Sequence, residues 1–116
     1  LELLQKAILQ LIMNKCGLTQ REVESAKDGE VKNCCLILTK EEYEEAAFEE
    51  RKDFKFVIAK NLKAISSYLF FGNSLQFAFM PEVENIADRA FQFCPLTAVC
   101  FLKVKIVGDG AFRGCE

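Results

Sequence analysis

The six cysteines are the residues of this chain best suited to chemistry, as nucleophiles, metal ligands or disulfide partners. They are Cys16, Cys34, Cys35, Cys94, Cys100 and Cys115. None belongs to a C-x-x-C pair, and the 116 residues include no histidine, so the sequence predicts neither a zinc site nor a Cys–His or Ser–His catalytic pair. The even number leaves disulfides open as an alternative. The adjacent Cys34–Cys35 pair and the apolar surroundings of the others favour reduced, buried thiols.

Carboxylates offer a second kind of chemistry, as acid–base groups or metal ligands. Six of them are close together: Glu41, Glu42, Glu44, Glu45, Glu49 and Glu50. Basic residues lie on both sides of them, which favours a solvated helix face. Asp88 and Asp109 are 21 residues apart and would stack, but without a glycine-rich calcium-binding nonapeptide they are better explained as turn caps. The sequence therefore predicts no catalytic, cofactor or metal site, and no enzyme.

The composition predicts a folded chain. Hydrophobic residues make up 51% and charged residues 28% of the sequence, and the net charge is −2 without a basic cluster. Binding to nucleic acid is therefore not expected. The opening segment LELLQKAILQLIM is too short and too interrupted by polar residues to span a bilayer, and no signal peptide is recognised. Localisation stays open, with reduced thiols slightly favouring the cell interior over the cell surface.

The second half of the chain repeats with a period of 21 residues. Two columns show the spacing most plainly: Ile65, Ile86 and Val107, and Phe70, Phe91 and Phe112. Three copies cover residues 54–74, 75–95 and 96–116. Each copy can hold a short strand, a second extended stretch and one helical turn, but it cannot bury its apolar side alone. Stacked copies would bury a continuous ladder of like residues, which predicts a solenoid.

The last copy reads L-x-x-V-x-F-L-x-V-x-x-V-G-x-x-A-F-x-x-C from Leu96 to Cys115 and resembles the BspA-type leucine-rich repeat. Met80–Pro81 matches the family's L-P step, and Asn73 stands where the later copies have cysteine. The period of 21 is two residues shorter than is usual for the family. The resemblance covers about residues 54–116. It implies a leucine-rich-repeat solenoid and a role in adhesion or protein–protein contact.

The first half is predicted to be mainly helical. Apolar spacing favours a helix over residues 1–15, and the capping box Thr19–Glu22 predicts a second helix that starts at Gln20 and ends by Gly29. A strand is expected over Val31–Leu38, followed by a helix from a second capping box at 39–42 to about Lys52. The predicted fold is thus an α/β leucine-rich-repeat solenoid of three repeats with a helical N-terminal cap. The alternative for residues 1–53 is a separate small interaction module.

Alternation along the repeat strands predicts an apolar outward face. Val57, Ala59, Ala78, Met80, Val99 and Phe101 would point inward, which leaves Phe56, Ile58, Phe77 and Phe79 on the opposite side. A soluble monomer rarely leaves such a patch bare. Three explanations compete: the N-terminal helices cover it, a partner protein or second copy covers it, or the strand phase is shifted by one residue.

These observations favour a non-catalytic scaffold for protein–protein interaction. The expected contact surface is the strand face formed by Phe56, Ile58, Phe77 and Phe79, centred on Phe77 and Phe79. Two alternatives remain open: a fragment of a cell-surface adhesin, or a regulatory or recognition domain of a larger protein.

Overall fold

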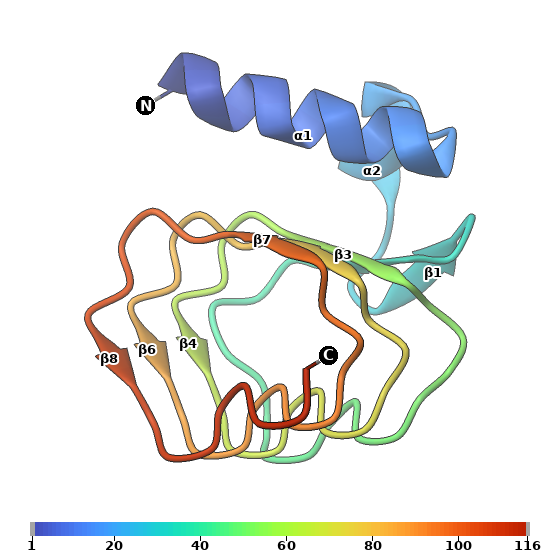
Figure 1. The fold of residues 1–116 in the computed structure, drawn as a ribbon. Coiled ribbons are helices and arrows are strands. Elements are labelled where there is room, and N and C mark those ends of the chain that lie inside the picture. The colour runs from blue at the N-terminus through green and yellow to red at the C-terminus, as the bar shows by residue number, and fades with distance from the viewer. Residues whose placement is uncertain (1, 116) are drawn as a thin grey trace.

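Residues that recur every 21 positions are stacked in the fold. The computed structural model describes residues 2–115, which form two helices and a β-solenoid (Figure 1). The elements are α1 (Glu2–Cys16), α2 (Gln20–Ser25), β1 (Glu30–Lys32), β2 (Cys35–Leu38), β3 (Phe56–Ala59), β4 (Ala64–Ile65), β5 (Phe77–Phe79), β6 (Asn85–Ile86), β7 (Ala98–Cys100) and β8 (Ile106–Val107). We number the coils of the solenoid from the N-terminal side. Coil 1 comprises residues 33–53, and coils 2, 3 and 4 are the three predicted repeats.

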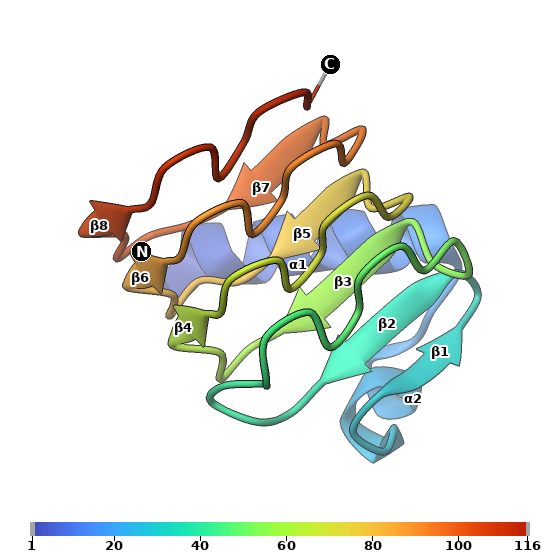
Figure 2. The ribbon, with the colours of Figure 1, turned by 90° about the horizontal axis from the view of Figure 1, so that it is seen from below.

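Two sheets run along the stack of coils (Figure 2). The larger has the strand order β1-β2-β3-β5-β7, and the smaller has the order β4-β6-β8. All neighbouring pairs are parallel except β1 and β2. Phe56 lies opposite Phe77, and Phe77 opposite Ala98, so each coil is displaced by 21 residues from the one before. The predicted solenoid of 21-residue repeats is confirmed.

Coil 1 is where the sequence-based prediction fails. The strand expected over Val31–Leu38 is two antiparallel strands, β1 and β2, because Asn33 and Cys34 both have positive φ and form a two-residue hairpin turn. The helix expected up to Lys52 does not form. Residues 39–53 instead make turns whose amides donate to coil 2, for example Phe48 N–H to Leu69 O at 3.1 Å. The division at residues 53 and 54 stays a prediction, although β2 on its N-terminal side stacks directly on β3.

The core of the solenoid is a column of phenylalanine rings, one from each coil. Phe48, Phe70, Phe91 and Phe112 stack with centroid distances of 5.7, 5.4 and 5.3 Å. Aliphatic columns surround the rings and include Leu62 and Ile65, which are fully buried. The core therefore runs along the stack, and each coil is packed mainly against the coils next to it.

A second apolar cluster joins α1 to the larger sheet. The helix predicted over residues 1–15 is confirmed as α1, which lies across the outer face of that sheet (Figures 1 and 2). Its buried residues Ile12, Met13 and Cys16 pack against the outward side chains of the strands. No helix within residues 2–115 is long and apolar enough to cross a membrane.

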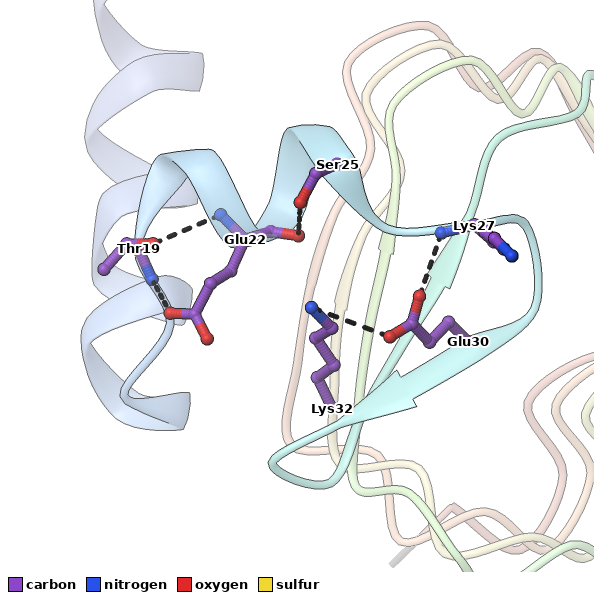
Figure 3. A network of polar contacts seen from close by, with 6 residues as sticks. All are labelled: Thr19, Glu22, Ser25, Lys27, Glu30 and Lys32. Atoms are coloured by element: carbon purple, nitrogen blue, oxygen red, sulfur yellow. Dashed lines mark hydrogen bonds and ion pairs between the residues drawn. The ribbon is translucent and has the colours of Figure 1, made fainter.

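The capping box that predicted the start of α2 is present. The Glu22 amide donates to Oγ1 of Thr19 at 3.2 Å, and the Thr19 amide donates to the Glu22 carboxylate at 3.0 Å (Figure 3). These two bonds satisfy amides that a helix start leaves free. The helix ends at Ser25, within the predicted limit of Gly29, and its residue Val23 is buried in the second apolar cluster.

Candidate partner-binding groove

The structure divides the four predicted contact residues into two pairs. Ile58 and Phe79 are only 1% and 2% exposed, because α1 packs on them. Phe56 and Phe77 lie half-buried beside this cluster, and their rings stack at 5.2 Å. As long as α1 is docked, Ile58 and Phe79 cannot touch a partner. Only Phe56 and Phe77 remain available for that role.

The observed packing decides among the three explanations for the patch. Val57, Ala59, Ala78 and Met80 belong to the inner core, so the predicted strand phase is confirmed for coils 2 and 3. The outward residues meet α1, so the N-terminal helices do cover the patch. The cover is incomplete on the side of β7, because α1 lies mainly over β3 and β5.

An apolar groove remains between α1 and β7. It has a volume of about 280 Å³ and is lined by Ile8, Leu11, Ile12, Lys15, Phe77, Ala78, Ala98, Val99 and Cys100. Leu11 is 61% exposed, and Ala98, which lies opposite Phe77 on the same face of the sheet, is exposed as well. Neighbouring exposed apolar groups of this kind are more informative than a single exposed residue. Lys15 is the one charged lining residue, and its Nζ lies 5.1 Å from the centre of the Phe77 ring. The groove thus combines apolar walls with a cation at its rim.

A second hollow, of about 640 Å³, lies against coil 1, and two of its polar lining residues, Asp28 and Tyr43, are bonded to each other. The Asp28 carboxylate accepts hydrogen bonds from the Thr39 amide, at 2.8 Å, and from the Tyr43 hydroxyl. Burial raises the pKa of Tyr43 to about 12, and the Asp28 contact adds to this. For Asp28, burial opposes ionisation, but the hydrogen bonds together lower the pKa of the carboxyl. These contacts fasten the β1 hairpin to coil 1.

The carboxylates that were considered for acid–base or metal chemistry make contacts between coils. The Asp88 carboxylate accepts a hydrogen bond from the Asp109 amide at 2.8 Å, so it caps the turn of the next coil. Glu41 pairs with Lys63 of coil 2 at 3.4 Å. Within residues 2–115, no three or more cysteine, aspartate or glutamate side chains are grouped as metal ligands.

All six cysteines are free thiols in the structure. Burial raises the pKa of Cys35 and, to about 12, that of Cys94. The Cys94 thiol donates to the carbonyl of Phe70 at 2.7 Å, and Cys115 donates to that of Phe91 at 2.9 Å. These thiols therefore act as core hydrogen-bond donors and are poor nucleophiles.

In the folded protein, iodoacetamide is expected to label the exposed Cys34 much faster than Cys35 or Cys94. The thiolate is the reacting form, and a pKa of about 12 lowers its population at Cys94 about a thousandfold relative to an ordinary thiol. Peptide mass spectrometry after a timed reaction measures the labelling at each residue, with denatured protein as the control for equal reactivity. Equal rates at Cys34 and Cys94 in the folded state would contradict this assignment.

One comparison with known proteins gives a match. The family model described as BspA type leucine rich repeat region (6 copies) matches residues 30–116, so the matched region begins at β1 and includes coil 1. The searches of curated proteins and of solved structures gave no match. The family match suggests a repeat domain for protein interaction and is typical of proteins without enzymatic activity.

Proposed function

Because the chain belongs to the BspA-type leucine-rich repeat family, we propose that it is a non-catalytic interaction scaffold that binds a partner protein through the groove between α1 and β7. The observation that carries the proposal is the apolar surface formed by Leu11, Phe77 and Ala98, which come from a helix and two strands. Exposed apolar surface of this kind marks sites of protein association. Phe77, from the predicted strand face, lines the groove, and the ring of Phe56 stacks on that of Phe77 at 5.2 Å.

Residues 2–32 have a second role in this proposal, as a cap. A solenoid end exposes apolar groups that neighbouring coils would otherwise cover. The helices cover the outer face of the larger sheet, and β1 pairs with the N-terminal edge of β2. The segment thus protects one end and one face of the stack, and α1 also supplies one wall of the groove.

The test compares two leucines of α1. Leu11→Ser is expected to weaken partner binding about 10- to 100-fold, because burial of a leucine side chain contributes about 1.5–3 kcal/mol. Leu3→Ser is the matched control, since Leu3 is on the same helix, 83% exposed and outside the groove. Immobilised wild-type protein and both variants are compared by quantitative mass spectrometry of the captured proteins, after circular dichroism has shown that the fold is intact.

The proposal predicts a protein that is captured by the wild type and by Leu3→Ser and is lost with Leu11→Ser. Equal capture by all three folded proteins would reject the groove as the binding site.

A further inference from the structure

Two cysteines meet where α1 ends and β2 begins, and we propose that they form a thiol–disulfide site. They are Cys16, the last residue of α1, and Cys35, the first residue of β2. Oxidation of this pair by a low-molecular-weight disulfide joins α1 covalently to the larger sheet. The inference concerns the attachment of α1 and does not depend on the proposed binding groove.

The two thiols are neighbours in the folded protein. Both side chains are buried in the second apolar cluster, which joins α1 to the outer face of the sheet. Burial raises the pKa of the Cys16 thiol, and a hydrogen bond with the Cys35 thiol opposes this effect. Burial also raises the pKa of Cys35, and its neighbour Cys16 adds to the increase. The pair is therefore assembled before any oxidation, so little movement is needed to form the bond.

Backbone contacts hold the two segments together beside the pair. The Asn33 side-chain amide donates to Gly17 O at 3.3 Å, so the turn before β2 is bonded to the residue that follows Cys16. Cys35 is fixed from both sides, because β2 is paired with β1 and with β3. These contacts belong to the N-terminal part of the stack, where every strand around the pair has its neighbours. The position of the pair thus follows from the fold of residues 16–35.

The hydrogen bonds of this pair differ from those of the buried thiols in the inner core. Cys94 donates to the carbonyl of Phe70 at 2.7 Å, a short bond that gives the thiol a structural role. The carbonyl contact of Cys35, with Leu36 O, is much longer at 3.9 Å. Cys16 has no carbonyl partner among residues 2–115. The role assigned to Cys94 therefore does not account for Cys16 and Cys35, whose closest polar partners are each other.

A third cysteine, Cys34, gives soluble oxidants access to the pair. It is exposed and has a φ of 63° in the turn between β1 and β2, a position that favours glycine. Its thiolate attacks the soluble disulfide, which forms a mixed disulfide and releases one thiolate. Cys16 then attacks the sulfur of Cys34 and releases the second thiolate, and Cys35 attacks the sulfur of Cys16 and restores free Cys34. The two released thiolates take up the protons of Cys16 and Cys35, so one soluble disulfide is reduced for each bond formed.

The test incubates the folded protein with oxidised glutathione until the reaction stops. After an acid quench the remaining thiols are alkylated, and peptide mass spectrometry identifies the linked residues. The wild type is expected to contain a Cys16–Cys35 disulfide that dithiothreitol reverses. Cys35→Ala is expected to contain at least about tenfold less intramolecular disulfide. Cys34→Gly is the matched control: it suits the positive φ, keeps the pair and should reach the same final amount at least about threefold more slowly.

Thermal melting followed by circular dichroism measures the effect of the bond on the fold. Oxidised wild-type protein is expected to melt at least about 5 °C higher than the reduced protein, because the disulfide closes the chain over residues 16–35 and constrains the unfolded state. Cys35→Ala, treated with oxidised glutathione in the same way, should show no increase. If Cys35→Ala fails to fold, Cys16→Ala provides the same comparison from the other side of the pair.

Three results would overturn the site. The first is wild-type protein in which Cys16 and Cys35 both stay reduced while glutathione remains attached to Cys34. The second is a Cys16–Cys34 disulfide that forms in Cys35→Ala to the same extent as the disulfide of the wild type. The third is an unchanged melting temperature after the bond has formed, which would show that the bond does not fasten α1. None of these results bears on the capture assay with Leu11→Ser, which tests the groove separately.

Discussion

Replacement of Phe91 by alanine is expected to lower the free energy of unfolding by about 3–5 kcal/mol. The ring is fully buried between Phe70 and Phe112, with centroid distances of 5.4 and 5.3 Å, so its loss leaves a cavity in the middle of the column. A loss of this size is a large share of the 5–15 kcal/mol typical of a folded domain. Urea denaturation followed by circular dichroism measures it, since the chain has no tryptophan to report fluorescence.

Phe93 provides the control within the same coil. Its ring is 55% exposed, and its backbone has a φ of 63°, a left-handed conformation that is costly for a bulky residue. The neighbouring coils have Gly72 and Gly114 at this position, also with positive φ. Phe93→Gly is therefore expected to change stability by no more than about 1 kcal/mol, because relief of backbone strain offsets the lost ring contact. Similar losses for the two phenylalanines would show that the stacked column is not the main support of the fold.

The second large effect is expected for Asn73→Leu, which should lower the free energy of unfolding by about 1–3 kcal/mol. The buried Asn73 amide donates to Phe48 O at 3.4 Å, and its Oδ1 accepts from the Leu75 amide at 2.9 Å. Leucine is similar in size but leaves the Leu75 amide buried without a partner and leaves Phe48 O with only its 3.4 Å bond from the Arg51 amide. The desolvation of these groups is the reason for the loss. Urea denaturation again gives the measurement.

Asn73→Cys is the matched control for that prediction. Cys94 and Cys115 occupy the same position in coils 3 and 4 and donate through Sγ to a carbonyl of the preceding coil. A cysteine at 73 can make the same bond to Phe48 O, so only the acceptor for the Leu75 amide is lost. The expected loss is about 1 kcal/mol. Equal losses for cysteine and leucine would contradict the assigned hydrogen-bonding role.

The sequence was sufficient to predict coils 2–4, because their columns keep one spacing. Phe56, Phe77 and Ala98 lie opposite one another at intervals of 21, which is the spacing that the sequence shows. The starts of α1 and α2 could also be predicted, since helical spacing and the Thr19–Glu22 capping box are local signals. Each of these features depends on residues that are close in sequence or strictly periodic.

Coil 1 could not be predicted from the same period. Phe48 stacks on Phe70, which is 22 positions away, so the spacing between coils 1 and 2 is one residue longer than the period of 21. Ala46 and Glu50 have positive φ although neither residue type favours it, and the glutamates around them predict a helix. The hydrogen bonds to coil 2 override that preference. Contacts between neighbouring coils determine the structure here, and local helix propensity does not predict such contacts.

The candidate site could be predicted only in part. Alternation along the strands identified Phe56 and Phe77, but the groove depends on where α1 crosses the sheet. Leu11 belongs to the apolar spacing that predicted the helix, yet it is exposed, because α1 is centred over β3 and β5 and not over β7. The position of a helix on a sheet depends on tertiary packing, and no local pattern in the sequence specifies it.

The way in which α1 is attached also affects how the protein moves. Its contacts with the larger sheet are mainly those of apolar side chains, whereas the coils are joined to one another by backbone hydrogen bonds. A segment attached in this way is expected to open locally at a lower free energy than the stacked coils. Amide exchange would therefore be faster in α1 than in β3 and β5, and a partner bound in the proposed groove, which contacts both α1 and β7, would slow the exchange in α1 without any change in the shape of the protein.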